Sequence, residues 1–199
     1  MFGHIPGLLF YPRTEWRKIA NLSDEQIKRL LPYPILMSLL PALGFYIGTT
    51  KIGWTVSGEN VVRITEASAI PLAVLTYAAL LGAIIFIGLM VSWMSQTYLV
   101  KTFPIKGIVA IGYACTPIFL AGAFAAYPIW WLDIILGVAA GVHTIYLIYM
   151  AIPLMMHVPG DRGFLYASAV FMVALVYVVV ILVSIAIIWE YIATPVFID

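Results

Sequence analysis

The sequence has little charge and almost no cysteine. Lys, Arg, Asp and Glu make up 10% of its 199 residues, the formal net charge is +1, and Cys115 is the single cysteine. A chain so close to neutral has no strong field with which to hold nucleic acid. One cysteine excludes an internal disulfide and any site that several cysteines would build.

Local motifs of catalysis are also missing. We find no Ser-His-Asp order with a nucleophile turn, no HExxH, no glycine loop for phosphate and no pair of carboxylates on one helix. The histidines lie in separate segments, at His4, His143 and His157. We therefore expect a protein that is not an enzyme and that holds neither a metal ion nor a cofactor.

Apolar residues dominate the chain. They make up 64% of it, and the mean hydropathy is +1.07, which is too high for a water-soluble globule. We predict an all-α integral membrane protein embedded in the lipid bilayer. Residues 1–31 form a separate cytoplasmic segment, and residues 32–199 form a bundle of five transmembrane helices, at about 34–50, 71–93, 105–126, 130–152 and 164–189.

The N-terminal segment is too interrupted and too charged to cross a bilayer. Its apolar and basic residues separate onto different sides of a short helix that begins at Pro12. These are Trp16, Ile19 and Ala20 on one side, and Arg13, Arg17 and Lys18 elsewhere. Such a helix is typical of a membrane interface. It either lies on the protein's own cytoplasmic face or offers a surface to lipid or to a partner. Ser23 and Gln26 then have the spacing of a capping box, which opens a second short helix.

Small residues recur every four positions in two spans. Gly44 and Gly48 do so in the first span, and Gly137 and Gly141 follow Asp133 at the same spacing in the fourth. Residues four apart lie on one helix face, and small side chains let two helices approach closely. We expect all four glycines to pack helices. The loop from 51 to 68 has Thr and Val residues that suit a short hairpin.

The third span contains a break at residues 112–117. Pro117 has no N–H to donate to the carbonyl of Tyr113, and its ring presses on that carbonyl, so the helix should bend there. In lipid, the freed carbonyl needs a neighbouring helix, a hydroxyl or a trapped water as its partner. Gly112 lets another backbone come close at that level. This side of the helix should face protein.

The same break carries a family resemblance. Gly112 and Tyr113, followed by three residues and Pro117 in the third of five spans, resemble the signature of the Yip family of Ypt/Rab-interacting membrane proteins. Residues 47–54 and 114–120 are similar to a bacterial inner-membrane member of this family. The resemblance implies a five-span bundle and a trafficking-type adaptor, without catalysis, that organises membrane or binds a membrane-protein partner or a second copy.

A second function stays open because polar groups occur inside the predicted spans. Asp133, His143 and Thr116 would be the residues of an ion or solute path, as in a transporter or channel. Each also has a structural interpretation. Asp133 suits the first turns of a helix, where the dipole favours a carboxylate. His143 near the middle of the membrane would hydrogen bond to a hydroxyl or to the freed carbonyl of Tyr113.

The distribution of Lys and Arg predicts the orientation. The first 31 residues hold five of them, Lys101 and Lys106 follow the second span, and Arg162 follows the fourth, which gives eight on one side. Lys51 and Arg63 are on the other side. Positive loops stay in the cytoplasm. In an inner (plasma) membrane we therefore expect the N-terminus to be cytoplasmic and the C-terminus to be outside.

Overall fold

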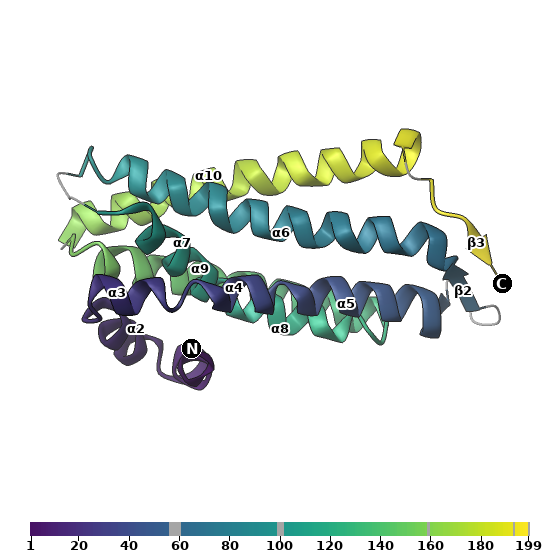
Figure 1. Ribbon diagram of the computed structural model, residues 1–199, viewed down its shortest axis with the longest axis horizontal. Helices are drawn as coiled ribbons and strands as arrows, with labels where there is room; N and C mark the ends of the chain where they lie inside the picture. Colours follow the sequence, from purple (N-terminus) through teal and green to yellow (C-terminus); the bar gives the residue numbers. More distant parts are fainter. Residues whose placement is uncertain (56–60, 99–101, 159, 193, 199) are drawn as a thin grey trace.

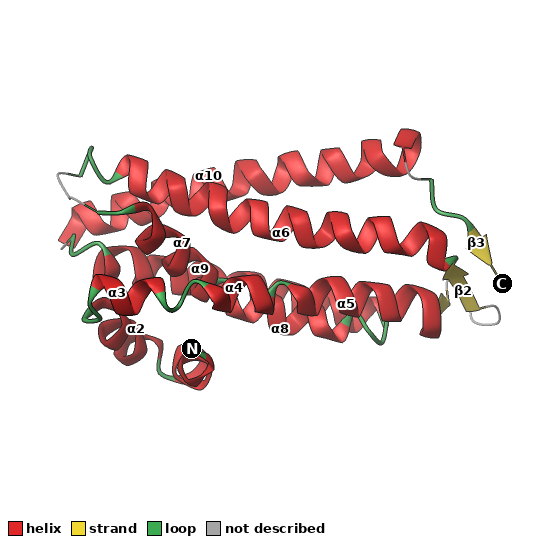
Figure 2. Cartoon of the chain, viewed as in Figure 1, coloured by secondary structure: helices red, strands yellow, loops and turns green. Residues whose placement is uncertain are grey.

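The computed structural model describes residues 1–199 except 56–60, 99–101, 159, 193 and 199, so Lys101 lies outside the described residues. Long helices run side by side along one axis (Figure 1). Short helices lie at one end of this bundle, and a small sheet lies at the other (Figure 2). The N-terminus is near the first end and the C-terminus is at the second.

The elements follow in chain order. The N-terminal part contains η1 (Phe2–His4), α1 (Ile5–Phe10), α2 (Pro12–Ala20) and α3 (Asp24–Lys28). The bundle contains α4 (Pro32–Met37), α5 (Leu39–Ile47), the π-helical turn η2 (Gly48–Ile52), α6 (Glu66–Met94), α7 (Pro104–Ala114), α8 (Thr116–Phe124), α9 (Trp130–Met155), α10 (Gly160–Ile187) and the π-helical turn η3 (Ile188–Ile192). The strands are β1 (Trp54–Thr55), β2 (Val61–Ile64) and β3 (Phe197–Ile198).

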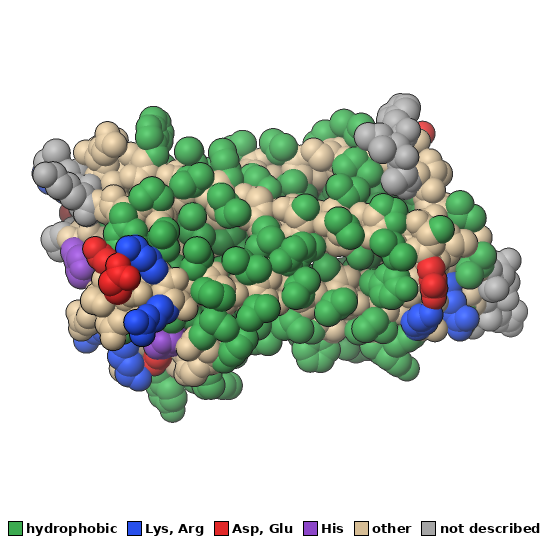
Figure 3. Space-filling model, in the orientation of Figure 1, with side chains coloured by type: hydrophobic (Ala, Val, Ile, Leu, Met, Phe, Trp, Pro, Cys, Tyr) green, Lys and Arg blue, Asp and Glu red, His purple; other side chains and the backbone are tan. Residues whose placement is uncertain are grey.

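The long helices are built to cross a membrane. Within the described residues, four helical stretches are long and apolar enough to do so: 24–52, 66–94, 130–155 and 160–190. The bent pair α7 and α8 makes up to five. Charged side chains gather at the two ends of the bundle, and hydrophobic side chains cover the surface between them (Figure 3). The prediction of an all-α membrane protein is confirmed.

Prolines decide where two of these spans break. The axes of α7 and α8 differ by 42°, and the junction is Cys115, which confirms the bend expected from Pro117. In the first span, α4 ends and α5 begins at Ser38. Pro41 is the reason, because it has no N–H for the carbonyl of Met37. Each bend leaves a helix whose two halves contact different neighbours.

The helix α6 begins before the proline that was expected to mark its start. The sequence predicted a start at about Pro71, whereas α6 begins at Glu66. Thr65 is extended, and its carbonyl accepts hydrogen bonds from the N–H groups of Ser68 and Ala69, so the first turn is already closed. Pro71 lies inside this helix and leaves the carbonyl of Ala67 without its helical donor, but α6 continues through it.

The loop after the first span folds as the expected hairpin, and the C-terminus joins it. β1 pairs antiparallel with β2, with Trp54 opposite Val62. β2 pairs antiparallel with β3, with Arg63 opposite Ile198. This sheet ties the end of the chain to the η2 end of the bundle.

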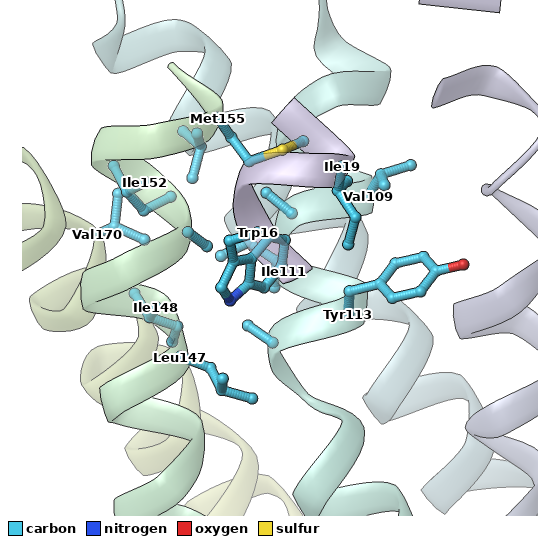
Figure 4. Close-up of a cluster of buried hydrophobic side chains, with 14 of the residues drawn as sticks. Trp16, Ile19, Val109, Ile111, Tyr113, Leu147, Ile148, Ile152, Met155 and Val170 are labelled. Carbon is cyan, nitrogen blue, oxygen red and sulfur yellow. The ribbon is translucent and has the colours of Figure 1, made fainter. Parts of the chain in front are cut away.

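The apolar face of α2 packs on the protein rather than on lipid. Trp16 and Ile19 are completely buried, and Trp16 lies among Ile111 of α7 and Leu147 and Ile148 of α9 (Figure 4). This agrees with the interpretation in which the N-terminal helix lies on the protein's own face.

The predicted capping box is confirmed at the start of α3. The hydroxyl of Ser23 accepts from the N–H of Gln26 at 3.3 Å, and the amide oxygen of Gln26 accepts from the N–H of Ser23 at 2.9 Å. Two of the N–H groups that a helix start leaves unpaired are satisfied in this way.

The two glycine pairs lie in different surroundings. A Cβ on Gly44 of α5 would overlap the carbonyl oxygen of Gly122 in α8, and a Cβ on Gly48 at the start of η2 would overlap that of Ala125, the residue after α8. The two segments therefore approach at backbone distance. A Cβ on Gly137 or Gly141 would meet nothing within 4 Å. Within the described residues, no other helix packs closely on Gly137 or Gly141.

This difference gives a matched pair of substitutions. Gly48→Ala places a methyl group against a backbone carbonyl, and we expect it to lower the free energy of unfolding in detergent by roughly 1–3 kcal/mol. Gly137→Ala enters open space and should be neutral, or stabilising by up to about 1 kcal/mol, because alanine favours the helix over glycine. Thermal unfolding of the two variants measures the difference. Equal behaviour would contradict a close contact between the start of η2 and the residues after α8.

Candidate functional site

The bend between α7 and α8 is the centre of a buried polar and aromatic cluster. The rings of Tyr33 from α4 and Tyr113 from α7 stack with centroids 4.0 Å apart and planes 16° apart. Both side chains are completely buried. Beside them, a Cβ on Gly112 would lie 2.7 Å from the Cβ of Pro34. The absence of a side chain at Gly112 is therefore what lets α4 lie against α7.

The hydroxyl of Thr116 satisfies the carbonyl that Pro117 leaves without its helical donor, and a second hydroxyl contacts Thr116. Thr116 Oγ1 donates to the carbonyl of Tyr113 at 2.6 Å. The hydroxyl of Tyr33 lies 2.7 Å from Thr116 Oγ1. Because the single proton of Thr116 is used on the carbonyl, Tyr33 is the donor in this second bond. The freed carbonyl thus has a hydroxyl as its partner, one of the three kinds that the sequence left open, and Tyr33 is the last donor in the chain of hydrogen bonds.

The N-terminus of the chain covers this cluster. The hydroxyl of Tyr113 donates to the carbonyl of Met1 at 3.1 Å. The ring of His4 meets Tyr113 edge-on with centroids 5.9 Å apart, and the ring of Phe2 meets Tyr33 in the same way at 5.8 Å. These contacts join the first residues of the chain to the middle of the bundle.

The buried carboxylate of Glu15, with His4 and Lys18 as its partners, connects the N-terminal helices α1 and α2. The carboxylate of Glu15 lies 2.6 Å from His4 Nδ1 and 2.9 Å from Lys18 Nζ, and only 6% of the residue is exposed. Burial raises the pKa of Glu15, but the hydrogen bonds from His4 and Lys18 outweigh it, so the pKa is lower than usual. A Cβ on Gly7 would overlap this carboxylate, so Gly7 makes room for it.

Sequence reasoning missed this group almost entirely. Glu15 and Lys18 stand three apart on a helix, which is a local signal for an ion pair. Nothing in the sequence connected His4 with Glu15, or Tyr33 with Thr116, because each pair belongs to different elements that only the fold brings together.

The three residues expected for an ion path are not joined to one another by hydrogen bonds in the described part of the chain. Thr116 belongs to the cluster at the bend. Asp133 lies in the first turn of α9, beside a groove of about 300 Å³ between α5, α8 and α9. His143 Nε2 is buried with no hydrogen-bond partner among the described residues, and its ring meets Tyr146 edge-on at 6.0 Å. The hydroxyl or carbonyl expected as its partner is not in contact.

Segment 47–54, which carried part of the resemblance, forms the junction between α5 and the sheet. Gly48 packs on Ala125 and Ala126, which follow α8. Gly53 ends the η2 turn with φ of 79°, in the left-handed region that favours glycine, and a Cβ there would lie 2.6 Å from both Val61 and Val62. A side chain at this point would push β2 away.

Comparison with known proteins identifies the family of this bundle. The model of the Yip1 domain matches residues 7–182. The chain belongs to the Yip1 family. Inner membrane protein YohC of Escherichia coli strain K12 is 29% identical over 188 residues, which cover 94% of this chain and 96% of that protein. YohC of Escherichia coli O6:H1 matches to the same extent. No solved structure matches.

The Yip1 domain contains most of the cluster at the bend. Its matched range includes Glu15, Tyr33, Tyr113 and Thr116, and it begins after His4. The family resemblance drawn from the bend in the third span is therefore confirmed.

Among the described residues, no three His, Cys, Asp or Glu side chains lie close enough to share a metal ion.

The hydrogen bonds at the bend of the Yip1 domain predict unequal effects of two substitutions. Thr116→Val keeps the shape but leaves both the Tyr113 carbonyl and the Tyr33 hydroxyl without a partner, so unfolding should become easier by on the order of 2–4 kcal/mol. Tyr33→Phe removes one hydroxyl and leaves the carbonyl bonded, so the loss should be about 1 kcal/mol. Denaturation in detergent checks the order. A Thr116→Val protein as stable as Tyr33→Phe would contradict the assignment.

Proposed function

We propose that this Yip1-family protein acts without catalysis as an adaptor that binds transmembrane helices of other proteins. The observation that supports this most is a crevice of about 400 Å³ between α5, α6 and the C-terminal half of α10. Apolar side chains dominate its walls, which include Phe45, Leu72, Leu75, Ile181 and Ile185. Clefts of this size and lining are typical of sites for apolar ligands, and in a membrane the apolar side chains of a partner helix can fill one.

The hydroxyl groups of the crevice are already satisfied. The hydroxyl of Thr76 donates to the carbonyl of Leu72 at 2.9 Å, and that of Ser184 donates to the carbonyl of Val180 at 2.8 Å. A polar solute would gain little from hydroxyls that are occupied, whereas an apolar helix needs no further hydrogen bonds from them. The chemistry of the walls thus favours a helix of another membrane protein, or of a second copy, over a solute.

The free surface of α10 adds to this argument. Beyond its first turns this helix is mostly exposed: Val176 is 65% exposed and Leu182 is 62% exposed. Two tyrosines attach it to α6, because Tyr166 donates to the carbonyl of Val91 and Tyr177 donates to that of Ala79 at 3.0 Å. The helix is therefore anchored on one side and available for partners on the other.

A photo-crosslinking side chain tests the adaptor function. Placed at Ile185 in the crevice, it should form one defined adduct with a membrane-protein partner in cells, and Ala78→Leu, which narrows the same crevice, should remove that adduct. The same group at Val142, an exposed position on α9, is the matched control and should not form it. Adducts with lipid alone at Ile185 would argue against an adaptor.

Transport of a small solute or ion is the second candidate, and buried polar atoms of α9 support it. His143 Nε2 and Thr144 Oγ1 are both without hydrogen-bond partners among the described residues. Such atoms in a membrane are often functional. Against a continuous path stands the position of Asp133, ten residues from His143 on the same helix and therefore about 15 Å away along it.

His143→Ala separates the two functions. Transport through α9 predicts that this variant, reconstituted in vesicles, loses proton or solute flux while its thermal stability stays nearly the same. The adaptor function predicts no flux in the unchanged protein and a retained Ile185 adduct in the variant. A measured flux that disappears with the imidazole would overturn the adaptor proposal.

We further propose that the protein lies in an inner membrane with its N-terminus in the cytoplasm. YohC carries the name of an inner membrane protein, and the described Lys and Arg residues gather mainly at the end of the bundle that holds α2 and α3. Basic residues are retained on the cytoplasmic side.

Reporter fusions check this orientation. A reporter after Asp199 should be active outside the membrane, and one in the loop between α9 and α10 should be active in the cytoplasm. The same side for both positions would contradict five crossings, and an exchange of the two sides would contradict the charge argument.

A further inference from the structure

The first helix of the chain lies across the bundle. In Figure 1, α1 is the purple helix beside the N label and is viewed along its axis, whereas the long helices run across the view, so α1 lies crosswise to them. Because the long helices cross the membrane, α1 runs parallel to its surface. Helices in this position place an apolar side among the lipids of one leaflet.

The corner between α1 and α2 leaves two aromatic side chains uncovered. Phe10 is 75% exposed and Tyr11 is 74% exposed, although Leu8, two residues earlier, is completely buried. Figure 3 shows apolar side chains standing out beside basic ones at this end of the molecule. Tyrosine and other aromatic residues are enriched at the level of the lipid headgroups.

Two arginines follow this corner without an acidic partner. Arg13 and Arg17 are exposed on α2, and no salt bridge involves them within the described ranges. The nearest carboxylate in sequence, that of Glu15, already contacts His4 and Lys18. Residues four apart stand next to each other on a helix surface, so both guanidinium groups can reach one phosphate.

We propose that this corner binds an anionic phospholipid, with Phe10 and Tyr11 at the boundary between the acyl chains and the headgroups and with Arg13 and Arg17 on the phosphate. Along the chain, the aromatic residues come first and the two arginines follow. The layers of a leaflet have the same order, from the acyl region to the headgroups. A guanidinium group binds phosphate in a bidentate manner, and an anionic lipid adds a favourable charge that a zwitterionic lipid lacks. The site needs no protein partner, so it is independent of the adaptor proposal.

Lipid retention tests the basic half of the site. The full chain is reconstituted with phosphatidylcholine and phosphatidylglycerol, extracted in mild detergent and analysed by native mass spectrometry for bound lipid. Arg13→Gln combined with Arg17→Gln should lower the preference for phosphatidylglycerol roughly 30-fold, from about 1 kcal/mol for each basic side chain. Lys28→Gln combined with Arg29→Gln removes the same charge from the same end and should change the preference much less. An unchanged preference in the first double variant would overturn the proposal.

Fluorescence quenching tests the aromatic half. A fluorophore on Phe10→Cys, in a chain with Cys115→Ala, should be quenched by lipids brominated on their acyl chains and protected from aqueous iodide. The matched control is Glu25→Cys, at a side chain that is 77% exposed on α3, and it should show the reverse pattern. Quenching of the Phe10 probe by iodide, or protection from both quenchers as under a second copy or another protein, would each overturn the proposal.

Discussion

The carbonyl oxygen of Tyr113 is the group on which the middle of this bundle depends. Pro117 cannot donate to it, and an unsatisfied backbone group inside a membrane costs several kcal/mol. Thr116 supplies the missing donor from one residue before the proline, and Tyr33 holds Thr116 from another span. The bend and the contact between the first and third spans therefore stabilise each other.

Several features of the fold follow from that contact. Gly112 must lack a side chain because Pro34 occupies the space next to it. The stacked ring of Tyr113 presents its hydroxyl to the carbonyl of Met1, so the N-terminal helices are attached at the same level. With these contacts the bundle is tightly packed around α7, whereas the far half of α10 remains free and leaves the crevice beside α5 and α6. In the proposed adaptor function, the tightly packed residues around α7 support the bundle, and the uncovered half of α10 with its crevice binds the partner.

Composition and hydropathy were enough to predict the class of protein, because the pattern of apolar runs depends on the bilayer and not on details of packing. The bend was predictable from Pro117, since its cause is local. The spacing of the glycines was a weaker guide: it shows which face of a helix is small but not what lies opposite. For this reason the same pattern packs on α8 at Gly44 and faces open space at Gly137. The partners Tyr33 and Glu15 had no local signal that pointed across the fold.

A double-mutant cycle between Tyr33→Phe and Thr116→Val tests the central claim most directly. Each single variant and the double variant are unfolded in the same detergent, and the coupling free energy is the departure from additivity. If the hydroxyls of Tyr33 and Thr116 form one chain of hydrogen bonds to the Tyr113 carbonyl, the coupling should be on the order of 0.5–3 kcal/mol. The reason is that the second substitution removes a hydroxyl whose hydrogen-bond partner the first substitution has already removed. Additive effects, with a coupling near zero, would contradict the account in which Tyr33 and Thr116 jointly stabilise the bend.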